Sequence, residues 1–357
     1  KAPQSRARNN LLDSRQKKTK ILSEKAQLRE TALRAGNFIY APSMKTTVSI
    51  KILAILAASC AQAFALTYFA GKRNPETEEE KNMKYSTCQW GSSGDFETPP
   101  LPSKPGVNDT LSTRWGSGYK LDIDANIQVG QISNGDGSTI TAKGKTIKVK
   151  RGLSMGVPGG SSSTIAFEDC TLEFGGNLSI SYWDGHRGIG NSSLTLKNTK
   201  FDMAGALGCI IPVHPLVNSN TRGGFTLALE GKTVATFGEG TVIDTIFSEK
   251  PEQWAFKIQM SETDGNIPAL KFTGGTADFT GCDFDVRISP KAKKGVYTLI
   301  EFANKKSQLG KLTRFTVNGN PYSMGQTVNV GALKATITEG EIGRNSKSDK
   351  NVILTIK

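Results

Sequence analysis

The chain has little of the chemistry on which many enzymes and metal proteins depend. It contains two histidines in 357 residues, His186 and His214, and neither has a cysteine or carboxylate at the spacing of a zinc site. No phosphate-binding loop, nucleophile elbow or dinucleotide-binding fingerprint is present. The sequence therefore predicts no metal and no cofactor.

Long apolar runs are also missing. The run 52–58 is shorter than the roughly 20 residues that span a bilayer. It follows Met44 and two lysines, and it ends in small residues of the A-x-A type at 63–65. This pattern predicts a secretory signal peptide at 44–65 and export to the periplasm, the cell surface or the exterior, with no stable membrane span after cleavage. Residues 1–43 are then interpreted as a helical or disordered leader that is not part of the mature protein.

Cysteine and net charge are both modest in the exported part. Cys88, Cys170, Cys209 and Cys282 follow the predicted cleavage site, and their wide separation predicts one disulfide or none. The whole chain carries +13, of which residues 1–43 supply +7 and 44–65 supply +2, so about +4 remains (13 − 7 − 2). So small a positive charge does not indicate a nucleic-acid partner.

What the sequence does contain is a short pattern repeated five times: apolar-x-apolar-x-turn-x-x-apolar-x-apolar. The copies begin at Ile140, Ile165, Leu194, Leu227 and Leu270. The turn positions are Gly144, Asp169, Asn198, Gly231 and Gly274, residue types that tolerate left-handed backbone. Each copy reads as two short strands, and the spacing matches one coil of a solenoid, with extra residues leaving as loops from one corner. The predicted fold is all-β, a right-handed parallel β-helix over 119–289.

The flanking segments differ from the repeats. Residues 66–118 are polar and proline-rich and are predicted to be a linker that becomes ordered toward its end. The insertion between Val234 and Leu270 leaves room for a further, degenerate coil. Residues 290–357 contain alternating strand patterns and are predicted to form a C-terminal β module that covers the open end of the solenoid.

Several segments carry a family resemblance. Residues 90–96, Asp109-Thr110, 193–201 and 295–300 resemble secreted autotransporter-type β-strand-repeat proteins of Gram-negative bacteria. The resemblance implies a right-handed β-helix passenger, a surface or adhesive protein. The chain departs from that pattern, because the 67 residues after Pro290 are too few for a translocating barrel. We therefore expect release to the periplasm or the exterior.

One loop gathers side chains suited to sugar binding: Tyr182, Trp183, Asp184, His186 and Arg187. Aromatic faces stack on sugar rings, and Asp and Arg can hold hydroxyls or an acidic group. The alternative is a surface loop with Asp184-Gly185 as a turn.

Two other patterns have simpler interpretations. Asp122-x-Asp124-x-Asn126 resembles half of a calcium loop but lacks its glycine and closing glutamate, so outward strand positions explain it. Lys143, Lys145, Lys148 and Lys150 alternate with apolar residues and read as a solvated face, with a patch for acidic glycans as the alternative.

Two functions remain open. The first is an exported, non-catalytic structural or adhesive solenoid whose partner is an extracellular glycan or a cell-surface matrix. The second is a carbohydrate-active lyase or hydrolase, or a glycan-binding module, that uses the 182–187 loop. The sequence leaves the oligomeric state open.

Overall fold

The structure is a computed structural model, in which the chain divides into two units, Lys1–Phe64 and Ala65–Lys357. It describes residues 66–71, 77–92, 101, 103–113, 118–135, 137–157, 163–182, 191–210, 223–243, 254–343 and 347–357. The predicted leader (1–43) and signal peptide (44–65) lie outside these residues. Within the described part, no helix is both long and apolar enough to cross a bilayer, and the helix α3 (Glu78–Lys81) has a single turn.

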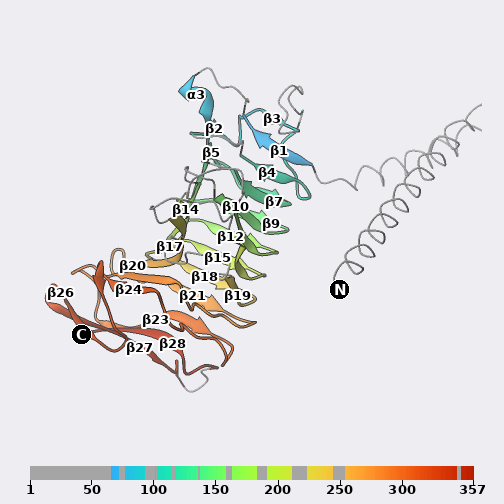
Figure 1. Cartoon of the computed structure of the whole chain (residues 1–357). Coiled ribbons are helices and arrows are strands. Elements are labelled where there is room, and N and C mark those ends of the chain that lie inside the picture. Colours follow the sequence, from blue (N-terminus) through green and yellow to red (C-terminus); the bar gives the residue numbers. More distant parts are fainter. Residues whose placement is uncertain are drawn as a thin grey trace, which may run out of the picture. The chain divides into compact units, whose positions relative to one another are not determined.

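The described strands form three sheets, here called A, B and C (Figure 1). In hydrogen-bonded order, sheet A contains β19 (Thr241–Ile243), β16 (Leu207–Ile210), β13 (Leu178–Tyr182), β10 (Leu153–Val157), β7 (Gln131–Asn134), β4 (Thr110–Ser112), β1 (Thr67–Ala70) and β3 (Trp90–Gly91). Sheet B contains β2 (Asn82–Lys84), β5 (Lys120–Asp122), β8 (Thr139–Lys143), β11 (Thr164–Glu168), β14 (Asn191–Lys197), β17 (Gly223–Glu230), β20 (Trp254–Ser261), β22 (Asp283–Arg287), β24 (Arg314–Val317) and β25 (Asn320–Pro321). Sheet C contains β26 (Thr327–Val330), β27 (Leu333–Gly340), β28 (Asn351–Ile356), β23 (Gly295–Phe302), β21 (Ala269–Phe272), β18 (Val234–Phe237), β15 (Lys200–Met203), β12 (Thr171–Phe174), β9 (Thr146–Val149) and β6 (Ile127–Val129).

From β5 to β21, the chain visits the sheets in the fixed order B, C, A. One coil is β8, β9 and β10, and the next is β11, β12 and β13, each strand parallel to its counterpart in the previous coil. Most strands are thereby hydrogen-bonded on both sides, which leaves edges only at the ends of the stack. The structure thus confirms an all-β, parallel solenoid.

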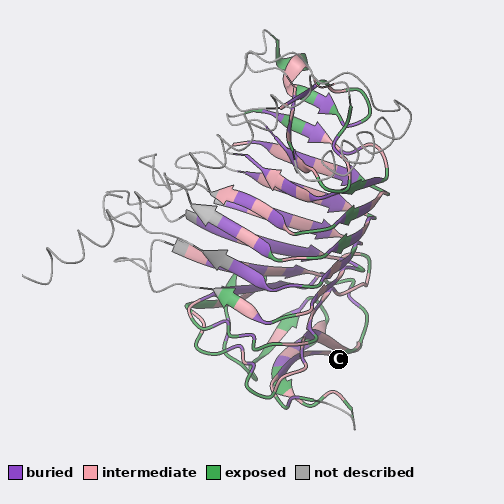
Figure 2. Ribbon diagram, turned by 90° about the vertical axis from the view of Figure 1, so that its right-hand side faces the viewer, coloured by how far each residue is buried: buried purple, intermediate pink, exposed green. Residues whose placement is uncertain are grey.

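Inward side chains form columns that run from coil to coil. On sheet B, Ile140, Ile165, Leu194, Leu227 and Ile258 are paired in successive strands, and each is at most 1% exposed. Figure 2 shows the alternation of buried and partly exposed residues along these strands. Burying each such side chain contributes about 1.5–3 kcal/mol, so the period-2 pattern itself drives the stacking.

Sheet C carries a row of phenylalanines inside the tube. Phe174, Phe201, Phe237, Phe272 and Phe302 follow one another with ring centroids 5.3, 5.6, 5.6 and 6.0 Å apart. These separations lie within the range of favourable ring contacts. The row therefore joins coils built from residues more than a hundred positions apart into one core.

The corner between sheets B and C requires left-handed backbone. Asp169 and Asn198 have φ of 53° and 49°, and Gly144 and Gly231 have φ of 65° and 63°. The side chain of Asn198 also accepts a hydrogen bond from the Lys232 amide at 3.1 Å, across to the next coil. Four of the five predicted turn residues are confirmed.

The fifth copy of the repeat is not equivalent to the other four. Leu270 and Phe272 lie on β21 in sheet C, whereas the corresponding residues of the earlier copies lie on sheet B. The sheet B strand of this coil is β20, where Ile258 continues the column after Leu227. The predicted degenerate coil is therefore the regular one, and the residue with positive φ here is Gly275 (62°), not Gly274.

The solenoid also begins earlier than its predicted start at residue 119. In the predicted linker, β1 and β4 pair in parallel in sheet A, and β2 pairs in parallel with β5 in sheet B. Tyr68, Met83 and Trp90 are buried in the same core as the repeats. Part of 66–118 is thus solenoid, because bulky apolar residues on strands of two to four residues are enough to extend the columns.

The C-terminal strands extend sheet C at the other end of the tube. β23 pairs in parallel with β21 of the last coils and antiparallel with β28, which pairs antiparallel with β27. A regular coil would leave its last strand unpaired on one side. Here, antiparallel strands occupy that side of sheet C.

Candidate functional site

Between β8 and β20, the long connections of the solenoid join sheet A to sheet B. Connections from B to C and from C to A have two or three residues in the four coils from β8 to β19, whereas the A-to-B connections after β10, β13, β16 and β19 have six, eight, twelve and ten. The strand ends that flank these connections are neighbours in sheets A and B. The prediction that the extra residues leave from one corner is confirmed.

The predicted sugar-binding residues belong to one of these connections. Tyr182 ends β13 and pairs in register with Val157 of β10. Its side chain, together with Trp183, Asp184, His186 and Arg187, lies outside the described residues. The proposed grouping of these five side chains therefore stays a prediction, as does the loop placement of His214.

The outward faces of the coils carry charges in matched pairs. Lys143 and Lys197 lie on either side of Glu168 in sheet B, with ammonium–carboxylate distances of 3.2 and 3.0 Å. Hydrogen bonds from Lys197 and Lys143 lower the pKa of Glu168 below its ordinary value. On sheet C, Lys148 pairs with Glu173 at 3.0 Å. Two of the four alternating lysines thus belong to ion-pair ladders.

Hydroxyl groups occupy other outward rows. Thr139, Thr164, Ser193 and Thr226 follow one another in register on sheet B, all partly exposed. Adjacent parallel strands lie about 4.8 Å apart, so the row presents a regular series of groups that both donate and accept hydrogen bonds. Such a face suits a hydroxylated ligand.

The half-calcium pattern is used within the fold. The amide and hydroxyl of Ser86 donate to Asp124, the amide at 2.8 Å, and the Asn126 side chain accepts from the Thr146 amide at 2.9 Å. Although partial desolvation opposes it, bonding from Ser86 lowers the pKa of Asp124. These oxygens join neighbouring coils. Among the described residues, no group of three or more His, Cys, Asp or Glu is arranged to hold a metal ion.

The structure brings together a carboxylate pair that the sequence did not suggest. Asp283 and Asp285 share the outward face of β22, two residues and hence about 6.6 Å apart, yet they are 6% and 4% exposed. Asp285 accepts from Thr316 at 2.8 Å and from Arg287 at 3.0 Å, and it pairs with Lys257 at 3.2 Å.

Two carboxylates on one face are the residue types that glycoside hydrolysis uses. Desolvation raises the pKa of Asp285, but the Thr316 hydrogen bond and the Lys257 and Arg287 charges outweigh it and lower the pKa. An ionised carboxylate held by three partners stabilises the stack of β20, β22 and β24. Because both groups are buried, a glycan chain would not reach them without a rearrangement.

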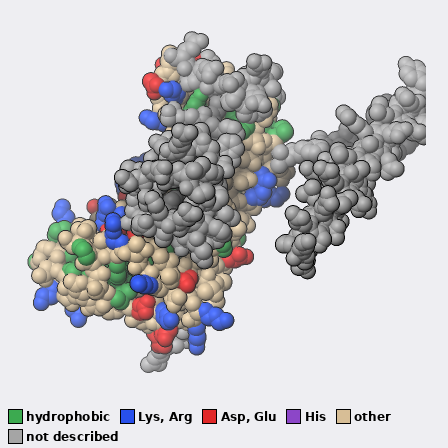
Figure 3. Space-filling view, viewed as in Figure 1, with side chains coloured by type: hydrophobic (Ala, Val, Ile, Leu, Met, Phe, Trp, Pro, Cys, Tyr) green, Lys and Arg blue, Asp and Glu red, His purple; other side chains and the backbone are tan. Residues whose placement is uncertain are grey.

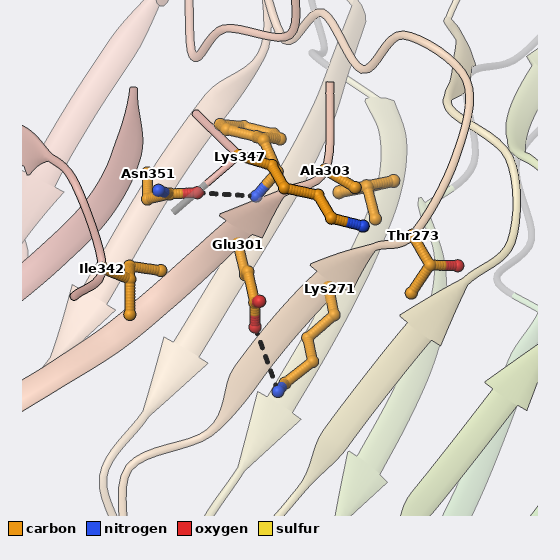
Figure 4. A pocket seen from close by; sticks show the side chains of 9 residues that line it. Lys271, Thr273, Glu301, Ala303, Ile342, Lys347 and Asn351 are labelled. Atoms are coloured by element: carbon orange, nitrogen blue, oxygen red, sulfur yellow. Dashed lines mark hydrogen bonds and ion pairs between the residues drawn. The ribbon is translucent and has the colours of Figure 1, made fainter. Parts of the chain in front are cut away.

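A cavity of about 300 Å³ lies where sheet C meets the C-terminal strands (Figure 4). It is lined by Lys271, Phe272, Thr273, Glu301, Phe302, Ala303, Ile342, Lys347 and Asn351. Lys271 pairs with Glu301 at 3.0 Å, and Asn351 accepts from the Phe302 amide at 2.8 Å. Figure 4 shows the Lys347 ammonium extending toward Thr273 and Ala303. The cavity offers one ammonium group for a small anion, at the lower limit of ligand-site size.

The structure describes the side chains of three cysteines after residue 65, and all three are free thiols: Cys88, Cys170 and Cys282. Burial raises the pKa of the Cys88 and Cys282 thiols to about 12, and it also raises that of Cys170. A thiol with a raised pKa is a poor nucleophile. Cys170 and Cys282 act as small buried apolar residues, and Cys88 is partly buried against the same core.

Comparison with protein-family models, with curated proteins and with solved structures gave no match for this chain. The functional conclusions below therefore depend on the residues and the geometry of the chain itself.

Proposed function

We propose that the protein is an exported, non-catalytic adhesive or structural solenoid, wound in the right-handed sense, that holds an extracellular glycan or matrix on its outward faces. The right-handed winding follows from the strong preference of parallel crossover connections for that hand. The autotransporter-type resemblance and the predicted signal peptide support export to the periplasm, the cell surface or the exterior.

The unbroken column on sheet B is the observation that carries this proposal. Paired inward residues run from Met83 of β2 to Phe315 of β24, and the outward positions between them carry ion pairs and hydroxyl rows. A stack of this kind presents a long, regular and rigid surface. Such a surface suits repeated weak contacts with a polymer.

The carbohydrate-active alternative needs convergent ionisable groups that a substrate can reach. The candidates are the 182–187 loop, which lies outside the described residues, and the Asp283–Asp285 pair, which is buried. The fold is compatible with either function, since folds do not determine activity.

The test uses the full chain, expressed with its own leader. The proposal predicts an exported product, binding to at least one extracellular polysaccharide on a glycan array, and no new reducing ends or unsaturated sugars after prolonged incubation. The loss of glycan affinity in Trp183→Ala measures how much the 182–187 loop contributes to binding, and Val242→Ala is the control for removal of an exposed apolar side chain. Release of sugar products would contradict the proposal and support the enzyme, and retention in the cytoplasm would contradict export.

A further inference from the structure

The C-terminal sheet has an outward face unlike those of the solenoid. In β27 and β28, residues Ile337, Leu354 and Ile356 face the core and are at most 2% exposed. On the opposite side, Thr327, Thr336, Thr355 and Val296 form one row across the four strands β26, β27, β28 and β23. Val296 is 71% exposed. This side, together with the lysines described next, is called the Thr–Lys face.

Lysines occupy one end of the Thr–Lys face. Lys334 and Lys357 exchange backbone hydrogen bonds of 2.9 and 3.1 Å, so they lie directly opposite each other. Each is two residues from a threonine of the row and therefore faces the same side. Lys294 lies two residues before Val296, in the bend just before the neighbouring strand β23 begins. All three lysines are exposed.

These lysines lack the acidic partners that the solenoid provides. Lys143, Lys148 and Lys271 each pair with a glutamate at 3.0–3.2 Å. In contrast, none of Lys294, Lys334 and Lys357 forms an ion pair with a described residue.

The charge of the whole C-terminal segment strengthens the contrast. Residues 290–357 contain twelve Lys and Arg against four Asp and Glu, a net +8 (12 − 4), and none of the acids falls between Glu301 and Glu339. Residues 66–289 carry 21 Lys and Arg against 25 Asp and Glu, a net −4 (21 − 25). Figure 3 shows Lys and Arg side chains around the C-terminal strands. The exported part is thus mildly basic only because a basic end and an acidic tube nearly cancel.

The composition of the face favours one class of polyanion. Binding of single-stranded nucleic acid relies on aromatic stacking platforms, and arginine forks favour phosphate, yet Tyr322 is buried and Tyr297 packs on the core. Interfacial membrane binding needs a broad apolar surface, and Val296 is one strongly exposed side chain in a threonine row. Threonine hydroxyls bond to sugar hydroxyls in both directions, and ammonium groups pair with carboxylate or sulfate.

We propose that the Thr–Lys face binds a polyanionic glycan, a polysaccharide that carries carboxylate or sulfate groups along its length. The inference deepens the proposed adhesive function and rests on it. The Lys334–Lys357–Lys294 line attracts the charged groups of the chain, and the adjacent row of Thr327, Thr336 and Thr355 bonds to its hydroxyls.

The test measures the affinity of the full chain for heparin and polygalacturonate, with neutral dextran, an anionic phosphatidylglycerol vesicle and duplex DNA as comparison probes. The variant Lys294→Gln/Lys334→Gln/Lys357→Gln is compared with Lys143→Gln/Lys148→Gln/Lys271→Gln, which also removes three exposed positive charges. Circular dichroism checks that both fold. The expected result is a loss of about tenfold or more in polyanion affinity for the first variant and less than about threefold for the second.

A further variant, Thr336→Val/Thr355→Val, keeps the charge and β-propensity and is expected to weaken binding at high salt, where hydroxyl contacts contribute most. Equal losses in the two lysine variants, or tighter binding to DNA or vesicles than to either polysaccharide, overturn the proposal. If the chain binds neutral glycans but neither polyanion, this inference fails while the adhesive function stands. If it degrades the polysaccharides, the adhesive function itself fails.

Discussion

Removal of one ring from the phenylalanine row is expected to weaken the whole end of the solenoid. Phe272 is 2% exposed, and its ring centroid lies 5.6, 5.6 and 6.0 Å from those of Phe237, Phe279 and Phe302. Large-to-small changes at such sites cost about 3–5 kcal/mol. Because three ring contacts are lost at once, we expect Phe272→Ala to cost about 4 kcal/mol, a large part of the stability of a typical domain.

Guanidinium unfolding, followed by circular dichroism and by native-state hydrogen exchange in β18, β21 and β23, measures this loss. Exchange is included because stacked coils need not unfold in one step. Val296→Ala is the exposed control and should change stability by less than about 0.5 kcal/mol. If Phe272→Ala lowered the free energy of unfolding by less than about 1 kcal/mol, the ring of Phe272 would not be packed in the phenylalanine row.

A double-mutant cycle locates the contact. Phe237→Ala combined with Phe272→Ala should be non-additive by at least about 0.5 kcal/mol, since the rings touch, whereas Ile140→Ala, several coils away, should add to Phe272→Ala. If the effects of Phe237→Ala and Phe272→Ala were additive, the two rings would not be in contact.

Three further changes test other parts of the structure. Asp285→Asn is expected to lower the free energy of unfolding by about 1–3 kcal/mol at neutral pH. Because the pKa of Asp285 is lowered in the folded protein, its contribution is present above the unfolded pKa near 3.9 and is lost as the pH falls through the folded pKa. Unfolding measured against pH should therefore show the stabilities of the two proteins converging in acid, and a constant difference would contradict this. Asn198→Ala should lower the guanidinium midpoint by more than Asn198→Gly, because φ is 49° there and a Cβ costs about 1–2 kcal/mol in that region, and the reverse order would be inconsistent with the turn. Cys170 and Cys282, at 3% and 0% exposure, should resist iodoacetamide at pH 8 until the protein is unfolded, as mass spectrometry can show, and rapid labelling of the folded chain would exclude their burial.

The inward columns of sheet B could be predicted because the signals that specify them lie within a few residues of one another in the sequence. The alternation at Ile165 or Leu194 specifies which side chains point inward, and Asp169 and Asn198 specify where the backbone turns. The register of the fifth copy could not be assigned in the same way. The corner after β21 contains Gly274 and Gly275, followed by Ala277 and Phe279. Its sequence pattern is therefore the same as that of the corners that follow sheet B strands. Only the pairing of Ile258 with Leu227 decides between them.

The early coils and the basic face were missed for different reasons. Strands such as β2 and β3 have three and two residues, too few to show a period. The charge of 290–357 could be counted from the sequence, but it was averaged into the net +4 of residues 66–357. The alternation of Lys334, Thr336 and Thr338 was also visible, and only the antiparallel pairing with β28 shows that Lys357 and Thr355 continue it on the same side.

A crystal structure of residues 66–357 would show directly which side chains occupy the inward positions of sheet B. The account predicts that Ile165, Leu194, Leu227 and Ile258 occupy successive layers of one column, with Phe272 beside Phe237 in the neighbouring sheet. If Leu270 instead followed Leu227 in that column, or if these side chains faced solvent, the account would be contradicted.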